Sequence, residues 1–146
     1  MTDLLDGTTG LVVGVANKRS IAWAIARRLD EAGARLALTY QNRRTEGDVR
    51  KLADTLSHCQ AVLPLDVQDD AQIQRVMDAW QARYGTLDIL VHAVAYARKD
   101  ELEGKFLDTS RDGFALAMDI SAYSLVAITK AARPLMGDGG SILTLT

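Results

Sequence analysis

The sequence alternates short apolar runs, rich in β-branched residues, with longer segments whose apolar residues recur at helical spacing. The runs expected to form strands are Thr9–Val15, Arg35–Tyr40, Ala61–Leu65, Leu87–Val94 and Ser141–Thr146. Strands that are separated by helices are joined by crossovers and form a parallel sheet covered on both faces. Near-continuous apolar runs are typical of such a buried sheet. The alternation therefore predicts an α/β fold, a doubly wound parallel sheet of the Rossmann type, over residues 1–146.

The segments between the runs carry helix boundary signals. The expected helix starts are Ser20, Thr45 with Asp48 as a capping box, Asp69 or Asp70, and Thr109 with Asp112. The expected ends are marked by Gly33, Gly85 and Pro134. In the first helix, the residues at helical spacing are Ile21, Ile25, Leu29 and Ala32. This spacing predicts a helix over Ser20–Ala32.

A proline inside the third apolar run indicates the order of the strands. Pro64 has no amide hydrogen and is tolerated mainly in a strand at the edge of a sheet. The order 3-2-1-4-5, counted along the chain, places the third run at one edge. The fifth run then lies at the other edge with unpaired backbone groups, which is a liability for aggregation. We therefore expect a domain that is incomplete on its C-terminal side, with this chain as the N-terminal part of a larger protein.

The composition excludes several classes of protein. With 146 residues, 48% hydrophobic and 25% charged, the chain is too apolar for disorder. Its 17 basic and 19 acidic residues give a net charge of −2, unlike a nucleic-acid binder. The uncharged stretch Ile120–Thr129 is too short to span a membrane, and residues 1–6 lack the basic cluster of a secretory signal. The single cysteine, Cys59, excludes an intrachain disulfide and a cysteine zinc cluster, so we expect a cytoplasmic protein without a metal site.

The turn after the first run is the first candidate ligand site, and it reads GVANKRSIA from Gly14 to Ala22. In a doubly wound sheet this turn opens a helix whose free amide groups point at a pyrophosphate. Gly14 would allow close approach to the backbone, and Ser20 would either cap the helix or donate to a phosphate oxygen. The Gly-x-Gly-x-x-Gly pattern is absent, so an ordinary strand-to-helix turn stays open as the alternative.

Polar residues follow the second and third runs. Gln41 can hydrogen-bond a ribose without repelling a 2′-phosphate, as an acidic residue would. Arg43 and Arg44 either pair with such a phosphate or belong to a solvated loop. After the third run, Asp66 either accepts from an adenine amino group, with Val67 packed on the ring, or only starts a turn.

The fourth run ends in small residues, HAVAYA from His92 to Ala97. Such residues let a cofactor lie against the backbone, although close helix–strand packing is the alternative. We expect His92 to be a packed histidine rather than a base. All four candidate segments follow successive runs, whose carboxyl ends meet at one crevice in this fold. Their convergence predicts a dinucleotide site.

Six segments in combination carry a resemblance to a known family. They are Gly14 with SIA at 20–22, LTYQN at 38–42, Asp66-Val67, LVHAVAYA at 90–97, DISAYS at 119–124 and SILTLT at 141–146. The sequence resembles the bacterial enoyl-acyl-carrier-protein reductases, divergent members of the short-chain dehydrogenase/reductase family. Ordinary members usually have Gly-x-x-x-Gly-x-Gly after the first strand and Asn-Asn-Ala-Gly after the fourth, and this chain has neither.

The resemblance implies a role for particular residues. It places Gly14, Ser20 and Ile21 at the cofactor pyrophosphate, Gln41 at the adenosine ribose, Asp66 and Val67 at the adenine, Val94 at the nicotinamide-side ribose and Ala97 at the substrate. Many relatives have glycine where this chain has Ala95. The family's tyrosine and its Tyr-x-x-x-x-x-x-Lys pair would follow SILTLT, and Tyr123 cannot substitute because it lies in the long helix. No catalytic residue is therefore assigned, and the isolated chain is expected to be inactive.

The activity implied by the resemblance is NADH-dependent reduction of a trans-2-enoyl thioester on acyl carrier protein, in fatty-acid elongation. NADPH stays open through Arg43 or Arg44. The parent enzyme would be a homotetramer, which is doubtful for this chain. Arg98, Lys99 and Lys105 are candidates for docking the acidic carrier, but three acidic residues interrupt them and a solvated loop is the alternative. Two other functions stay open: a carbonyl-reducing short-chain dehydrogenase and a non-catalytic nucleotide-binding module.

Overall fold

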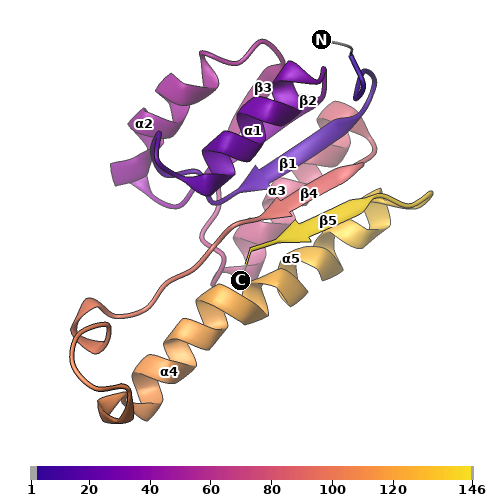
Figure 1. The fold of residues 1–146 in the computed structure, drawn as a ribbon. Coiled ribbons are helices and arrows are strands. Elements are labelled where there is room, and N and C mark those ends of the chain that lie inside the picture. The colour runs from indigo at the N-terminus through magenta and orange to yellow at the C-terminus, as the bar shows by residue number, and fades with distance from the viewer. Residues whose placement is uncertain (1–2, 146) are drawn as a thin grey trace.

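The computed structural model describes residues 3–145 and contains a five-stranded parallel sheet (Figure 1). The strands are β1 (Thr9–Val13), β2 (Arg35–Tyr40), β3 (Cys59–Pro64), β4 (Ile89–His92) and β5 (Ser141–Thr144). Their order is β3-β2-β1-β4-β5, as predicted, with Pro64 in an edge strand. In the central strand, Leu11 lies opposite Ala37 of β2 and Leu90 of β4.

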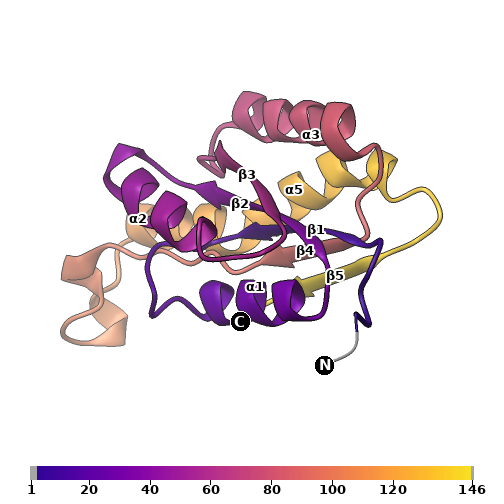
Figure 2. The same cartoon turned by 90° about the horizontal axis from the view of Figure 1, so that it is seen from above.

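Helices cover both faces of the sheet. They are α1 (Ile21–Glu31), α2 (Arg43–Ala53), α3 (Asp70–Tyr84), α4 (Arg111–Met118) and α5 (Ser124–Ala132). Neighbouring residues of β1 point to opposite faces, so Leu11 and Val13 pack in the core with α3 and α5, whereas Val12 packs with α1 and α2. Figure 2 shows α1 and α3 on opposite sides of the sheet. Burial on both faces accounts for the apolar strand sequences.

The element boundaries differ from the predicted ones at a few positions. β1 ends at Val13, before the Gly14 turn, and β4 covers only Ile89–His92 of the predicted run. β3 begins at Cys59 and ends at Pro64, which is two residues earlier and one residue earlier than predicted. α2 begins at Arg43 rather than near Thr45, because the Asn42 side chain accepts from the Arg44 amide at 2.9 Å and Thr45 completes this capping box. Similarly, the cap of α4 is Ser110, whose Oγ accepts from the Gly113 amide at 2.9 Å. β5 ends at Thr144, and residue 146 of the predicted strand lies outside the described residues.

The apolar spacing in α1 coincides only in part with the face that packs on the sheet. The inward residues of α1 are Ala22, Trp23 and Ala26, whereas Ile21 is 65% exposed. The two alanines allow the helix to lie close to the sheet, and Trp23 fills the space beside them. Ile25 and Leu29 pack at the margin of this contact, so among the residues at the apolar spacing it is Ile21 that faces solvent.

The last helical region has the extent that its boundary signals at Asp112 and Pro134 predicted. It runs from Arg111 to Leu135 through α4, a π-helical turn (Asp119–Tyr123), α5 and a 3-10 turn (Arg133–Leu135). By length and composition alone, this helical region is long and apolar enough to cross a membrane. The uncharged stretch Ile120–Thr129 is therefore not sufficient to exclude a membrane crossing. Ile128, Ala132 and Leu135 are buried against the sheet and α3. The region is thus an outer layer of the domain, and Figure 1 shows α4 extending past the carboxyl ends of the strands.

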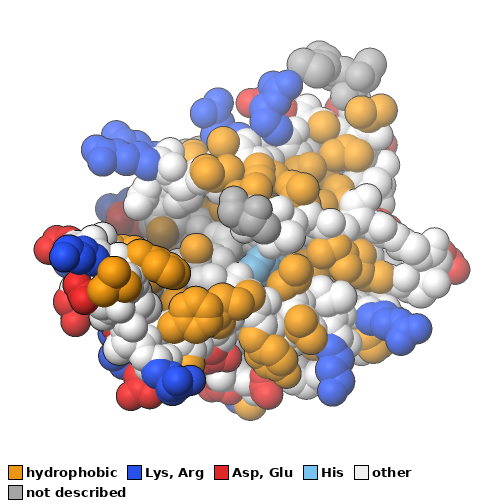
Figure 3. Space-filling view, turned by 60° about the horizontal axis from the view of Figure 1, so that its bottom comes forward, with side chains coloured by type: hydrophobic (Ala, Val, Ile, Leu, Met, Phe, Trp, Pro, Cys, Tyr) orange, Lys and Arg blue, Asp and Glu red, His pale blue; other side chains and the backbone are white. Residues whose placement is uncertain are grey.

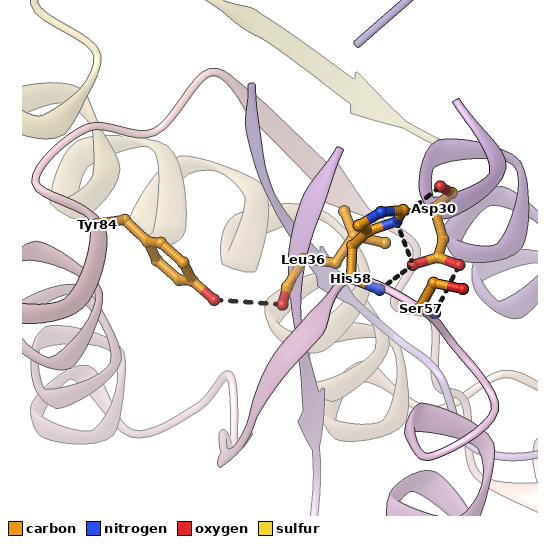
Figure 4. A network of polar contacts seen from close by, with 5 residues as sticks. All are labelled: Asp30, Leu36, Ser57, His58 and Tyr84. Atoms are coloured by element: carbon orange, nitrogen blue, oxygen red, sulfur yellow. Dashed lines mark hydrogen bonds and ion pairs between the residues drawn. The ribbon is translucent and has the colours of Figure 1, made fainter. Parts of the chain in front are cut away.

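Two polar contacts fix the amino-terminal ends of β2 and β3 (Figure 4). The buried Asp30 carboxylate, near the end of α1, accepts from the backbone amides of Ser57 and His58 at 2.9 and 2.7 Å. From the other face, the Tyr84 hydroxyl donates to the Leu36 carbonyl oxygen at 3.4 Å. Both contacts lie at the end of the sheet opposite the cleft described below.

Candidate functional site

A cleft lies at the carboxyl ends of β1, β2, β3 and β4 and has an empty volume of about 710 Å³. Its walls consist of the residues that end these strands and begin the following loops, together with Ile120 of the π-helical turn. The lining residues are Val13–Ala16, Thr39, Gln41, Thr45, Leu65–Val67, Ala93–Tyr96 and Ile120. Ligands of doubly wound sheets bind in this position, outside the strand ends where the order reverses.

Gly14 allows the turn after β1 to lie directly against the end of β4. Its φ of +117° disfavours other residues, and a Cβ there would lie 2.0 Å from the Ala93 carbonyl oxygen. The Ala93 amide donates to the Val13 carbonyl oxygen at 2.9 Å, so the two segments are also hydrogen-bonded. One wall of the cleft is therefore bare backbone, which a flat ligand can approach closely.

Ser20 orders the same turn in a way that the sequence did not specify. Its Oγ accepts from the amides of Ala16 and Asn17 at 3.0 and 3.1 Å, and it forms no side-chain cap on α1 although it occupies the N-cap position. Both contacts use the oxygen as acceptor, so the hydroxyl hydrogen remains free to donate. The turn thus presents a hydroxyl donor beside the start of a helix.

The start of α1 is suited to an anion. The amides of Ile21 and Ala22, in its first turn, have no intrahelical acceptor, and this turn contains no acidic residue. The helix dipole adds a partial positive charge at this end. Amide donors, the Ser20 hydroxyl and the adjacent Gly14 backbone form a donor set that fits a pyrophosphate.

The ends of β2 and β3 supply polar groups. Gln41 lines the cleft with its side chain exposed, while Arg43 and Arg44 are exposed in the first turn of α2 and do not line it. Asp66 Oδ1 accepts from the Gln68 amide at 3.0 Å, and the Asp66 amide donates to Gln72 Oε1 at 2.9 Å. Asp66 therefore starts a turn and also borders the cleft, so its two proposed roles are compatible.

Beyond β4, the loop is attached to the π-helical turn. The Ser121 Oγ accepts from the Tyr96 amide at 2.9 Å and donates to the Tyr96 carbonyl oxygen at 3.2 Å. Ile120, 7% exposed, lies under the same part of the cleft. Val94 and Ala95, which precede Tyr96 in the loop, line the cavity with small side chains.

His92 is a packed histidine, as predicted. It is fully buried, with Nε2 2.7 Å from Ser124 Oγ and Nδ1 2.9 Å from Thr144 Oγ1. Because the Ser124 hydroxyl donates to the Ile120 carbonyl oxygen at 2.6 Å, the network assigns the proton to Nε2 and makes Nδ1 the acceptor. Burial lowers the pKa of His92, which keeps the ring neutral. His92 therefore links β4 to β5 and α5 and does not face the cleft.

The structure brings together most of the predicted site residues. Those that line the cleft are Gly14, Gln41, Asp66, Val67 and Val94. Ser20 and Ile21 lie at the adjacent helix start, and Ala97 follows Tyr96 without lining the cavity. Sequence reasoning did not single out Thr39, Thr45 and Ile120. Ile120 lies in the DISAYS segment, but nothing in the sequence indicated a π-helical turn that would direct it at the cleft.

Comparison with known proteins gives a consistent result. A sequence model described as enoyl-(acyl carrier protein) reductase matches residues 14–146. The chain is 52% identical, over 143 residues, to an NADH enoyl-[acyl-carrier-protein] reductase of Bacillus subtilis, covering 97% of this chain and 55% of the relative. A corresponding enzyme of Rhizobium meliloti is 49% identical, with 98% and 52% covered. The chain thus spans about half the length of the curated relatives it matches.

Solved structures agree with the sequence relatives. An enoyl-acyl carrier protein reductase of Bacillus cereus, crystallised with NADP+ and an indole naphthyridinone, superposes with a TM-score of 0.94 at 50% identity. The superposition covers 98% of this chain and 56% of that chain. The enzyme of Anaplasma phagocytophilum, in complex with NAD, gives a TM-score of 0.94 at 41% identity, with 98% of this chain and 54% of that chain covered.

Proposed function

Since this chain belongs to the enoyl-(acyl carrier protein) reductase family, we propose that its cleft binds NADH for the reduction of a trans-2-enoyl thioester carried by acyl carrier protein. The observation that carries the proposal is the convergence of Gly14, Gln41, Asp66, Val67 and Val94 on one cleft from four successive strand ends. Chance placement would scatter such residues over the surface. Convergence at the sheet's switch point is what a dinucleotide requires.

In this proposal, each part of the cleft holds one part of the cofactor. Asp66 accepts from the adenine amino group, Val67 packs on the ring and Gln41 bonds the ribose. The Gly14 turn, Ser20 and the Ile21 amide bind the pyrophosphate with the donors described above. The second ribose and the nicotinamide lie along Val94 and Ala95, with the acyl chain near Ala97.

A bound nicotinamide would supply the hydride, and the residues that line the cleft would bind and orient it. The apolar side chains of Val94 and Ile120 border that end of the cleft. Neither His92 nor Tyr123 is assigned as a catalytic acid: both ring nitrogens of His92 are hydrogen-bonded, and Tyr123, 56% exposed, does not line the cleft. We further propose that the whole protein is a cytoplasmic homotetramer.

Cofactor preference depends on charges near the ribose. Gln41 is neutral, so selectivity for the 2′-phosphate of NADPH falls to Arg43 and Arg44. Both guanidinium groups belong to exposed residues, where water and salt weaken an ionic contact. We therefore propose that NADH is preferred and that any NADPH binding depends on these arginines.

The test is calorimetric titration of the chain with NADH and NADPH at low ionic strength. We expect NADH binding, with Asp66→Ala raising the Kd about tenfold, the effect of losing one charge-assisted hydrogen bond. The control Gln74→Ala removes an exposed α3 residue bonded only to Asp78, and it should leave the Kd unchanged. Absence of NADH binding would overturn the proposal. A tenfold preference for NADPH that Arg43→Ala removes would reverse the assignment of the cofactor.

A further inference from the structure

The π-helical turn Asp119–Tyr123 touches both polar walls of the cleft. Its Asp119 carboxylate accepts from Gln68 Nε2 at 2.9 Å, next to the end of β3. Its Ser121 hydroxyl binds the backbone of Tyr96, beyond β4, and its Ile120 side chain borders the cavity between them. π-helical turns insert one residue into a helix and occur frequently at functional sites. Here the turn directs three consecutive side chains at the loops and cavity.

We propose that Ser121 is a positioning residue, which holds the segment Val94–Tyr96 in place and thereby sets the nicotinamide end of the cleft. Tyr96 lies past the end of β4, so its amide and carbonyl groups have left the strand ladder. The Ser121 hydroxyl satisfies both groups at once, by accepting at 2.9 Å and donating at 3.2 Å. One side chain therefore replaces two missing ladder bonds at the point where the chain leaves the sheet.

The helix that carries Ser121 is itself fixed to the sheet. Three residues after Ser121, Ser124 is buried and bonded to His92 of β4 at 2.7 Å. The Ser124 hydroxyl also donates a hydrogen bond to the carbonyl oxygen of Ile120, in the π-helical turn, at 2.6 Å. Because β4 holds the turn and the turn holds the loop after β4, the position of Tyr96 is defined relative to its own strand.

The two anchors of the turn differ in the groups that they hold, although the hydrogen bonds of both are exposed. Asp119 binds the side chain of Gln68, whose position does not define the backbone. Ser121 acts on backbone, on the side of the cleft away from Gln41 and Asp66. Loss of the Ser121 hydroxyl should therefore weaken binding of the nicotinamide half and leave binding of the adenosine half unchanged.

The positioning role of Ser121 rests on the proposed function only in the measurement of NADH binding. The experiment compares wild type, Ser121→Ala, Ser121→Thr and the control Ser141→Ala, an exposed serine on β5. The Kd values for NADH and for ADP are measured by calorimetry, and the exchange rate of the Tyr96 amide is measured without ligand. Ser121→Ala should raise the Kd for NADH about tenfold, leave that for ADP unchanged and accelerate Tyr96 exchange. Ser121→Thr, which keeps the hydroxyl, and Ser141→Ala should behave as wild type.

Each other outcome has one meaning. Unchanged Tyr96 exchange in Ser121→Ala, or equal losses for NADH and ADP, overturns the positioning role. If the wild-type chain binds no NADH, the proposed function fails, and accelerated exchange with rescue by threonine still establishes the anchor. Should Ser121→Ala not fold, Ser121→Cys, which keeps the size and has a poorer hydrogen-bonding group, serves for the same comparison.

Discussion

Gly14 occupies the tightest position of the turn after β1, where neither conformation nor space admits a side chain. Its φ is +117°, and the atom a Cβ would meet is a backbone oxygen that cannot rotate away. Gly47, inside α2, is the opposite case, since it has an ordinary helical conformation and nothing within 4 Å of a Cβ. The same residue type is therefore required at one position and only tolerated at the other.

Gly14→Ala and Gly47→Ala should change stability in opposite directions. We expect Gly14→Ala to lower the free energy of unfolding by at least about 2 kcal/mol, from a strained φ and a displaced β4 end. Gly47→Ala should raise it by about 0.5–1 kcal/mol, because glycine loses more entropy in a helix. Urea denaturation measures both. A neutral Gly14→Ala would contradict the close approach of the turn to Ala93.

His92 makes stability depend on pH. Burial lowers its pKa in the folded state below the ordinary value of about 6.5. The unfolded chain therefore binds the proton first on acidification, and the stability due to neutral His92 is complete above about pH 6.5 and lost as the pH falls through the folded pKa. We expect urea denaturation at several pH values to show a smaller loss of stability below pH 6.5 for His92→Gln than for wild type. Parallel curves would show that His92 titrates normally.

At the scale of elements, the loop between β4 and α4 is fastened at both ends. Ser121 holds its first part, and Glu101 holds its last part by accepting from the Ser110 amide at 2.9 Å and from the Ser110 hydroxyl. These bonds lower the pKa of Glu101. Gly113, in the first turn of α4, leaves room for the carboxylate, because a Cβ there would lie 1.6 Å from Glu101 Oε2.

Gly113→Ala should therefore release the loop without unfolding the domain. The methyl group displaces the Glu101 carboxylate from Ser110, and we expect trypsin to cleave faster after Lys105, which lies in the released segment. The melting temperature should change little, since the contact is at the surface. Gly137→Ala, with nothing within 4 Å, is the matched control. Equal cleavage rates in both variants would mean that Glu101 does not restrain the loop.

At the scale of the whole molecule, apolar side chains lie exposed along one side of the domain. Figure 3 shows them over the face formed by the helical region and β5, with charged side chains mainly at its margins. They include Phe114, Met118, Tyr123 and Val126 on the helical side, and Ile142 and Leu143 on the edge strand. Exposed apolar side chains and an open strand edge both favour association.

We therefore expect the isolated chain to associate with further copies of itself. Sedimentation velocity should show a mean mass that increases with protein concentration, and Val126→Lys should reduce this increase because it places a charge in the apolar surface. Gly47→Lys introduces the same charge on α2, at an exposed position with nothing within 4 Å of a Cβ, and should have no effect. A monomeric mass at every protein concentration would show that the exposed apolar surface does not mediate association.

The sequence by itself determined the layers of this protein and the place of its site. Buried parallel strands must be apolar throughout and helices must carry a periodic stripe, so both are visible in the local sequence. Pro64, together with the doubly wound strand order, placed β3 at an edge. Residues that end successive parallel strands must meet, so the cleft between Gly14, Gln41, Asp66 and Val94 could be predicted without any contact being known.

Only the tertiary structure decided which face of α1 is buried, what Ser20 and Ser121 hold and where the last helix widens into a π-helical turn. These features depend on atoms brought together from distant parts of the chain: Tyr96 and Ser121 are bonded across 25 residues, and His92 and Ser124 across 32. Ile21 likewise satisfies the helical period but faces solvent, because the small side chains of Ala22 and Ala26 allow a closer contact with the sheet. The local sequence pattern indicates which residues of an element can be buried, whereas tertiary packing decides which of them are buried.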